Sequence, residues 1–249
     1  MEMVAKAPAD GYTLGTASGG THGANATLYG AKLPFDPVKD FTPITMLAEM
    51  KNILVVHRSL PISNLQELIA YAKAAPGQLT FGSSGTGTIQ HLTGEMFKAA
   101  AKIDIVHVSY RGQAQALPDL LSGRISMMFL GAGDAAAHVR SGSIVPIGIA
   151  SAERSLLLPN VVPLAEQGLP RFNAVTWFGL VGPSGVPDTI VDAYYANISA
   201  SLNQPDLKAR LVQMGLDPLA MPPREFGRFI SGEVDKWGGV IRSVGIKID

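Results

Sequence analysis

Residues 79–101 read LTFGSSGTGTIQHLTGEMFKAAA, which is an apolar run, a glycine-rich turn and an amphipathic run in succession. The apolar run at 79–83 is typical of a buried strand. The amphipathic run at 89–101 places Leu92, Met96 and Ala100 on one face of a predicted helix. A strand, a tight loop and a helix in this order form the repeating unit of an α/β fold, so this stretch indicates that fold class.

The same alternation continues on both sides of this stretch. Further apolar runs predict strands at residues 12–17, 44–46, 53–56, 105–108, 125–130, 144–150 and 177–181. A capping box at 63–66 predicts the start of a helix, and Gly123 closes another helix at 113–121. After Pro187 the patterns are helical only. We therefore expect largely parallel strands in a chain that leaves one α/β lobe, builds a second lobe and returns.

The composition excludes several classes of function. Among the 249 residues, 20 Lys plus Arg balance 20 Asp plus Glu, which argues against a nucleic-acid partner. The count of Cys is 0, so disulfides, thiolate catalysis and sulfur-ligated zinc are excluded. The best candidate for a membrane span, 125–130, is far too short and ends at Gly131. The first residues, MEMVAKAP, show no export signal.

The glycine-rich loop at 82–88 is the strongest local indication of a binding site. A loop between a strand and a helix directs backbone N–H groups and the positive end of the helix dipole at one point, which favours an anion. Neither the Walker motif nor the dinucleotide motif fits, because Thr88 follows Gly87 and Gln90 stands where a third glycine is needed. No cation adjoins the loop, so a carboxylate is favoured over a phosphate. The alternative is a tight turn with incidental hydroxyl groups.

Other candidate site residues are weaker, and each has a structural alternative. Ser18, Gly19 and Thr21 follow a predicted strand and repeat the logic of the first loop, although a generic turn explains them as well. Arg111 next to Tyr110 suits a bidentate contact with a carboxylate, or is simply exposed. Trp177 and Phe178 form the wall of a cleft or belong to the core, and the core is the better prediction for Phe178.

The residues offer many hydrogen-bond donors and few groups that handle protons. The histidines form no metal-binding pattern, so we expect no metal and no cofactor. His91 and Glu95 share a helix face, which is more typical of a solvated or capping contact than of catalysis. The nucleophile elbow Gly-x-Ser-x-Gly is absent, since the serines lie in Gly-Ser-Ser-Gly. This inventory predicts a binding protein and not an enzyme.

Several separate motifs resemble one known family. In order along the chain they are 7–14 (APADGYTL), 36–43 (DPVKDFTP), 68–73 (LIAYAK), the glycine-rich loop up to His91-Leu92, 108–112 (VSYRG) and 177–180 (WFGL). Together they resemble the Bug family, the extracytoplasmic solute receptors of tripartite tricarboxylate transporters. The resemblance extends from about Val4 to the C-terminus.

The resemblance implies a type II periplasmic-binding-protein fold, with two Rossmann-like lobes joined by two crossing strands. It places lobe 1 at 1–54 plus 181–249, lobe 2 at 55–180, and the crossings near 53–56 and 177–181. It also implies a periplasmic monomer that binds a dicarboxylate, tricarboxylate, acidic amino acid or aromatic acid in a cleft between the lobes. The implied partners are the two membrane subunits of the transporter.

Three differences from the family pattern bear on these expectations. The export signal and the first strand, loop and helix of lobe 1 are missing, so we expect an N-terminally truncated first lobe with impaired binding. Leu130 stands where an acidic residue is frequent, and Ser109 replaces a usual proline. Both differences affect the identity of the ligand and not the fold.

We expect the ligand-binding residues to be Ser18, Gly19, Thr21, Ser83, Ser84, Gly85, Thr86, Gly87, Thr88, His91, Tyr110, Arg111 and Trp177. Two rival functions remain at this stage. One is a ligand-sensing subunit for a membrane kinase. The other is an enzyme that acts on a small organic acid with His91 as base.

Overall fold

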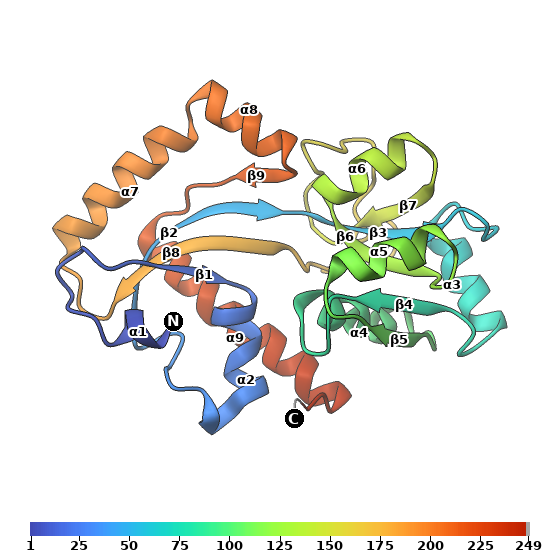
Figure 1. Ribbon diagram of the computed structural model, residues 1–249, viewed down its shortest axis with the longest axis horizontal. Coiled ribbons are helices and arrows are strands. Elements are labelled where there is room, and N and C mark those ends of the chain that lie inside the picture. Colours follow the sequence, from blue (N-terminus) through green and yellow to red (C-terminus); the bar gives the residue numbers. More distant parts are fainter. Residues whose placement is uncertain (248–249) are drawn as a thin grey trace. The chain divides into compact units, whose positions relative to one another are not determined.

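The computed structural model describes residues 1–247 and divides the chain into two compact units (Figure 1). Unit 1 contains Met1–Glu49, Thr176–Val212 and the chain from Asp217 onward. Unit 2 contains Met50–Val175 and Gln213–Leu216. Residues 53–56, which the family resemblance places at a crossing between lobes, lie inside the sheet of unit 2, and the chain enters that unit at Met50.

Unit 2 is built on a five-stranded sheet with the order β5-β4-β6-β3-β7. The strands are β3 (Asn52–His57), β4 (Thr80–Ser83), β5 (Val106–Ser109), β6 (Met127–Gly131) and β7 (Ile144–Ile149). Strand β4 runs parallel to β5 and β6, as the sequence predicts. Strand β3 runs antiparallel to both of its neighbours. It follows β2 (Phe41–Met50) after a single residue, so no crossover helix precedes it to bring it parallel to the others.

Four helices of unit 2 connect these strands: α3 (Leu65–Ala74), α4 (Ile89–Ala101), α5 (Gln113–Leu121) and α6 (Ala132–Arg140). The start of α3 lies one residue beyond the predicted position, because Asn64 is the N-cap and accepts from the Glu67 N–H at 2.9 Å. The Glu67 carboxylate in turn accepts from the Ser63 N–H at 2.7 Å. Thr88 is the N-cap of α4, which fixes where the glycine-rich loop ends and the helix begins.

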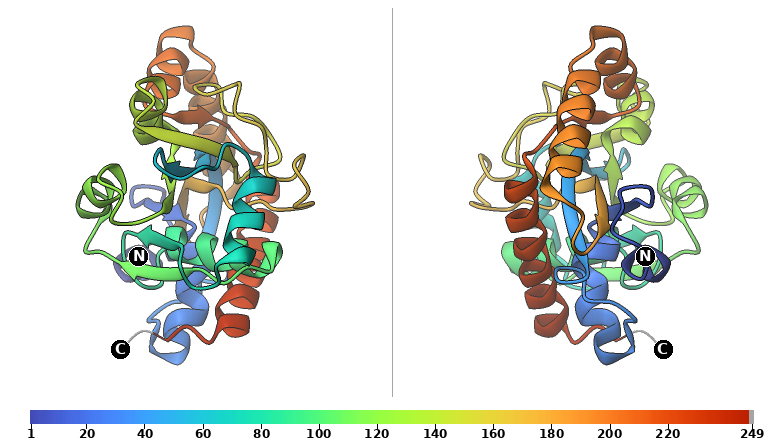
Figure 2. Two further views of the ribbon diagram at one scale, coloured as in Figure 1. Left: turned by 90° about the vertical axis from the view of Figure 1, so that its right-hand side faces the viewer. Right: turned by 90° about the vertical axis from the view of Figure 1, so that its left-hand side faces the viewer.

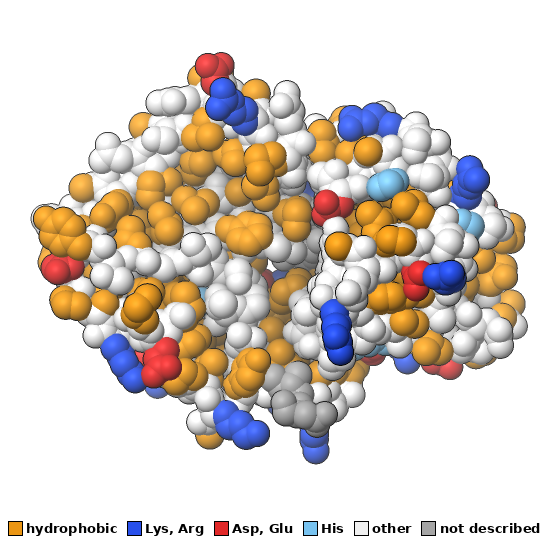
Figure 3. All heavy atoms as spheres, viewed as in Figure 1, with side chains coloured by type: hydrophobic (Ala, Val, Ile, Leu, Met, Phe, Trp, Pro, Cys, Tyr) orange, Lys and Arg blue, Asp and Glu red, His pale blue; other side chains and the backbone are white. Residues whose placement is uncertain are grey.

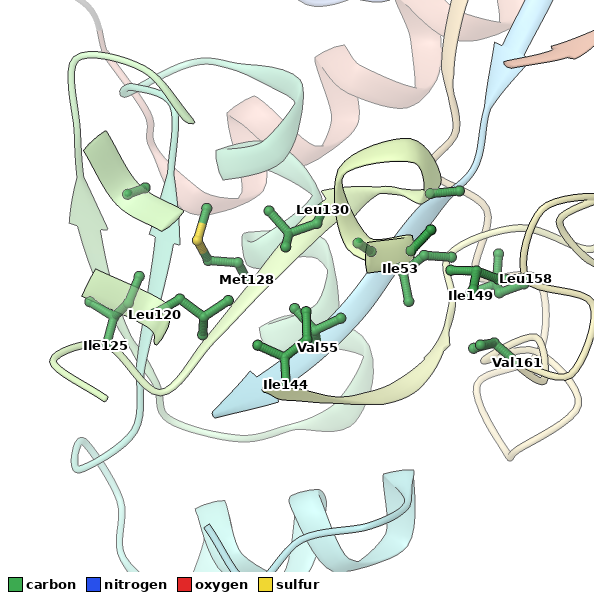
Figure 4. Close-up of a cluster of buried hydrophobic side chains, with 14 residues drawn as sticks. Ile53, Val55, Leu120, Ile125, Met128, Leu130, Ile144, Ile149, Leu158 and Val161 are labelled. Carbon is green, nitrogen blue, oxygen red and sulfur yellow. The ribbon is translucent and has the colours of Figure 1, made fainter. Parts of the chain in front are cut away.

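The core of unit 2 joins the sheet to its helices. Figure 4 shows Ile53 of β3 between Leu130 of β6 and Ile149 of β7, and Val55 of β3 beside Ile144 of β7. Leu120 of α5 and Ile125 lie at one end of this cluster. At the other end, Leu158 and Val161 belong to the segment that follows β7. That segment, residues 150–175, contains no helix and no strand.

Unit 1 is built on a four-stranded sheet with the order β1-β8-β2-β9. The strands are β1 (Gly15–Ser18), β2 (Phe41–Met50), β8 (Thr176–Pro183) and β9 (Leu216–Pro218), and β1 runs antiparallel to β8. The predicted strand at 12–17 therefore begins later, at Gly15. The region after Pro187 is not purely helical, since β9 interrupts it.

The described part of unit 1 also contains helices. They are α1 (Glu2–Ala5), α2 (Asn25–Tyr29), α7 (Asp188–Leu202), α8 (Pro205–Gln213) and α9 (Pro223–Val244), with a π-helical turn η1 (Gly20–Ala24) and a 3-10 turn η2 (Gly30–Lys32). Helix α9 runs beside α2 in the views of Figures 1 and 2. Its buried face, with Phe226 and Ile230, packs on Trp177 and Val181 of β8. None of the helices within residues 1–247 combines the length and the apolar character that crossing a bilayer requires.

Candidate functional site

The loops that follow β4 and β5 and the start of α6 lie along one edge of the sheet in unit 2. Strands β4, β5 and β6 are parallel, so their carboxyl ends at Ser83, Ser109 and Gly131 share that edge. In α/β sheets, ligands bind outside the carboxyl ends of the strands where neighbouring connections diverge. Strand β4 lies between β5 and β6, which places the glycine-rich loop at that position.

The glycine-rich loop owes its shape to positive φ angles at two positions. The backbone φ angle is 139° at Gly85 and 80° at Gly87, and residues other than glycine rarely adopt such positive values. The Thr88 hydroxyl donates to the Gly85 carbonyl at 2.7 Å. The loop is therefore closed on itself at the first turn of α4, where backbone N–H groups have no partner within the helix.

The buried Ser83 side chain anchors this loop through hydrogen bonds. Its side chain is fully buried, and its Oγ accepts from the Gly85 N–H at 3.2 Å. The same Oγ lies 2.7 Å from His107 Nε2. Ser83 was expected among the ligand-binding residues, but its hydroxyl is committed to the protein. Its contribution is to position the loop.

Two stacked histidines lie behind the loop. The rings of His91 and His107 have centroids 3.8 Å apart and an interplanar angle of 14°. His91 Nδ1 accepts from the Gly87 N–H at 3.1 Å, which requires that this nitrogen carry no proton. Burial, with the nearby His91 as a second cause, lowers the pKa of His107 to about 4. The neighbouring His91, whose Nε2 lies 3.7 Å from Glu95 Oε1, lowers the pKa of Glu95.

His91 is therefore a poor candidate for a catalytic base. It is 5% exposed, and the ring nitrogen that faces the loop already accepts a backbone hydrogen bond. A base must reach the proton that it removes, and here the loop backbone occupies that position. Like Ser83, His91 positions the loop.

A chain of carboxamide groups connects the starts of three helices. The Ser84 N–H donates to Gln90 Oε1 at 3.1 Å, and Gln90 Nε2 donates to Gln113 Oε1 at 2.6 Å. Gln113 Nε2 then donates to Asp134 Oδ2 at 2.7 Å. These side chains come from the first turns of α4, α5 and α6. We call Gln90, Gln113 and Asp134 the amide relay.

The sequence analysis did not find the amide relay. Its members lie far apart along the chain, and each is an ordinary polar residue at a helix start. Only the parallel arrangement of β4, β5 and β6 brings these helix starts together. The one available signal was the position of Gln90 and Gln113 within two residues of a predicted helix start.

The donors that remain accessible at this edge are few. Ser84 is half-buried, and its hydroxyl has no hydrogen-bond partner within residues 1–247. The exposed Thr86 is linked to Ser109 through their hydroxyl groups at 3.3 Å. Arg111 is exposed and makes no ion pair in the described part of the chain. These groups, with the loop backbone, form a donor-rich surface that suits a carboxylate.

Tyr110 faces away from this set of donors. Its hydroxyl donates to Asp119 Oδ2 at 2.8 Å, and Asp119 also pairs with Arg124 at 3.0 Å. Burial raises the pKa of Tyr110, and the hydrogen bond to Asp119 adds to the effect. The Tyr110 hydroxyl therefore fixes the loop after β5 to α5.

The second predicted loop belongs to unit 1. The Ser18 N–H donates to Thr21 Oγ1 at 3.0 Å, and the Thr21 N–H donates to Ser18 Oγ at 3.4 Å. Gly19 precedes the η1 turn and accepts from the Ala24 N–H at 2.9 Å. Burial lowers the pKa of the adjacent His22 to about 4. The two hydroxyls thus bond mainly to the turn itself, as expected for the generic turn.

Trp177 requires a correction. It is fully buried in unit 1, where its Nε1 donates to Glu233 Oε2 at 2.9 Å. Trp237 donates to the same oxygen at 2.9 Å, and Lys236 pairs with the other oxygen. Phe178, predicted for the core, is half-buried instead. Neighbouring side chains point to opposite faces of a strand, which explains why Trp177 of β8 is buried and Phe178 is not.

Comparisons with known proteins show the family to which this chain belongs. The family model described as tripartite tricarboxylate transporter family receptor matches residues 1–246. Protein BugT of Bordetella pertussis (strain Tohama I) is 30% identical over 247 residues, which cover 99% of this chain and 76% of BugT.

Two solved structures show the same fold with a ligand. R. palustris Rpa4515 with adipate has a TM-score of 0.84 and 32% identity, covering 99% of this chain and 82% of that chain. MatC (Rpa3494) from Rhodopseudomonas palustris with bound malate has a TM-score of 0.78 and 31% identity, covering 96% and 82%.

These matches confirm the resemblance to the Bug family, the type II periplasmic-binding-protein fold and the prediction of a binding protein and not an enzyme. The chain belongs to the family of tripartite tricarboxylate transporter receptors.

Proposed function

We propose that this chain is a periplasmic receptor that binds a small carboxylate at the glycine-rich loop of unit 2 and delivers it to the membrane subunits of a tripartite transporter. The observation that carries this proposal is the convergence of three helix starts and their donors at the carboxyl edge of β4, β5 and β6. Helix N-termini and N–H groups favour negative charge.

Within this site, the residues divide into donors and positioning groups. We propose that the hydroxyl groups of Ser84 and Thr86 and the Thr86 N–H donate to one carboxylate, because the N–H groups of Gly85, Gly87 and Thr88 already bond within the loop. Ser83, His91 and His107 hold the loop, because their polar atoms are buried against it. Hydrogen bonds to a charged group contribute about 1.5–3 kcal/mol each. Three or four of them therefore reach the roughly 8 kcal/mol that micromolar binding requires.

A dicarboxylate fits this arrangement better than a monocarboxylate. Arg111 is an exposed guanidinium on the loop after β5, next to the glycine-rich loop in the same unit. We propose that it pairs with a second carboxylate in bidentate geometry. The ligands named for the two solved relatives, adipate and malate, are both dicarboxylates. The expected participation of Ser18, Gly19 and Thr21 of unit 1 stays part of the proposal.

The surface charges and the family membership support what we propose for the partners and the location of this chain. On the face shown in Figure 3, Lys and Arg side chains lie singly and form no basic patch, which disfavours a nucleic-acid partner. The matching family is one of transporter receptors. Export to the periplasm and a monomeric state are proposed for this chain on that basis.

The test is calorimetric titration of the chain with adipate and with malate. Thr86→Val removes one hydroxyl donor, so we expect about a tenfold loss of affinity. Thr189→Val, at an exposed position of α7, is the matched control and should bind as the unmodified chain does. Saturable binding of either diacid with this difference supports the proposal. Equal affinity in Thr86→Val and Thr189→Val contradicts it.

A further inference from the structure

A cavity lies in unit 2 beside the edge strand β7. Its volume is about 530 Å³, within the range of about 300–1,000 Å³ that small-molecule sites occupy. None of its lining residues belongs to the glycine-rich loop or the amide relay. The lining is mainly apolar, with Val139, Pro146, Ile147, Leu157, Leu158 and Val162 among its residues.

The segment at 150–175 forms one wall of this cavity. Irregular segments longer than about 15 residues are uncommon and are usually functional. This one is fixed to the edge strand β7, because the Ile149 N–H donates to the Val162 carbonyl at 3.0 Å. Gln167 Nε2 also donates to the carbonyls of Ile147 and Val162, each at 3.0 Å. Figure 4 shows Leu158 and Val161 of the segment beside Ile149.

These contacts explain why the cavity persists beside a well-packed core. The backbone hydrogen bonds hold the segment at a fixed distance from β7, and Leu158 and Val161 anchor it to the hydrophobic cluster. The polar groups of Gln167 and Asn64 at the wall are already used, since Asn64 caps α3. What remains open to a ligand is mostly hydrocarbon.

One cationic side chain lines this apolar cavity. Arg140 ends α6, lines the cavity and is exposed, and it makes no ion pair within the described residues. The nearby Arg154 differs, because it pairs with Glu166 at 3.1 Å and does not line the cavity. No Asp or Glu is among the lining residues. An apolar space with one unpaired guanidinium is complementary to an amphiphilic anion.

We propose that this cavity is a second ligand site, which binds an amphiphilic monocarboxylate. The hydrocarbon part of the acid packs against Val139, Ile147 and Leu158, and its carboxylate pairs with Arg140. The site is separate from the glycine-rich loop and does not depend on the function proposed for that loop. The ligand class differs as well, since the loop offers polar donors and this cavity offers apolar contact.

The experiment uses decanoate as the probe and calorimetric titration of the full chain. Decanamide, which keeps the hydrocarbon chain and lacks the charge, is the second probe. Arg140→Gln removes the cation, and Arg154→Gln is the matched control on the wall segment. Val162→Trp fills the cavity, and its unfolding temperature shows whether it remains folded.

The proposal predicts saturable binding of decanoate, weakened about tenfold by Arg140→Gln and unchanged by Arg154→Gln. Decanamide should bind Arg140→Gln and the unmodified chain equally. A folded Val162→Trp should bind neither probe and should still bind adipate or malate at the loop. If Val162→Trp does not fold, the decanoate affinities of Arg140→Gln and Arg154→Gln decide whether the proposal holds.

Three results would overturn the proposal. The first is the absence of saturable decanoate binding. The second is an equal effect of Arg140→Gln and Arg154→Gln. The third is competition between decanoate and the diacid that Thr86→Val weakens, because it would place decanoate at the glycine-rich loop. A failure of the loop proposal alone would leave the decanoate results unaffected.

Discussion

Gln90 and Gln113 join the first turns of α4 and α5 through a hydrogen bond of 2.6 Å between their carboxamides. Each carboxamide uses its oxygen and its nitrogen, so the direction of every hydrogen bond from Ser84 to Asp134 is fixed. The chain ends on a carboxylate, which makes the last hydrogen bond a charge-assisted one. The amide relay therefore ties the glycine-rich loop to the two other helix starts at this edge.

Gln113→Ala should weaken binding of the loop ligand without unfolding the protein. The substitution interrupts the relay and leaves Gln90 free to rotate, so the Ser84 N–H loses its defined direction. We expect about a fivefold to tenfold loss of diacid affinity, equivalent to roughly 1 kcal/mol. Gln115→Ala, at an exposed position of the same helix, is the control. A Gln113→Ala variant with unchanged affinity in calorimetry would show that the relay has no role in binding.

Stability should fall in mild acid because of buried histidines. The pKa of His22 is lowered by burial to about 4, whereas in the unfolded chain it stays near 6.5. Between these values the unfolded state binds a proton that the folded state does not, so stability decreases as the pH falls through this window. At roughly 1.4 kcal/mol per pKa unit, His22 accounts for about 3 kcal/mol when the pH has fallen through the whole window. His107, with its pKa also near 4, adds to the same trend.

Urea unfolding across this pH range measures the effect. His22→Gln should flatten the pH dependence, and His138→Gln at the end of α6 is the comparison variant. The linkage account fails if the chain is as stable near pH 5 as near pH 7.5.

Two helical glycines should respond to alanine in opposite directions. A Cβ at Gly94 of α4 would overlap the Phe81 ring, which is fully buried. We expect Gly94→Ala to destabilise by about 1–3 kcal/mol through overpacking. Gly239 of α9 has no neighbouring atom within 4 Å of a Cβ, so Gly239→Ala should stabilise by about 0.5–1 kcal/mol. Thermal unfolding of the two variants tests the pair, and the same sign for both would contradict this packing account.

Glu233 should be essential for the stability of unit 1. It is 4% exposed and accepts from both indole N–H groups, of Trp177 and Trp237. Glu233→Leu leaves these donors buried without an acceptor, at a cost of about 1–3 kcal/mol for each unsatisfied group. Asp235→Leu, at an exposed position of the same helix, should have a small effect. Chemical denaturation distinguishes them, and similar stabilities would argue against the role of Glu233.

The alternation of elements was predictable from the sequence, and the direction of one strand was not. Apolar periodicity marked β4, β5, β6 and their helices, and parallel pairing followed from the helices between them. The reversal of β3 depends on how the chain enters unit 2, which hydrophobic pattern does not encode. The side of β8 that faces the core was likewise unreadable, because Trp177 and Phe178 are both apolar.

The glycine-rich loop was also predictable, because Gly85 and Gly87 stand between a strand and a helix. Which of its hydroxyl groups are buried and which are exposed was not predictable. Whether a hydroxyl faces solvent or the interior depends on backbone angles, which place Ser83 inside and Thr86 outside. The cavity beside Arg140 left no local signal in the sequence, since segments far apart along the chain form its walls.

The most direct test of the central claim is to follow the backbone amides of residues 84–88 by nuclear magnetic resonance while adipate or malate is added to saturation. The account predicts that the Thr86 amide signal moves in proportion to occupancy, because its N–H group lies at the carboxylate. Saturable binding with this signal unmoved would contradict it.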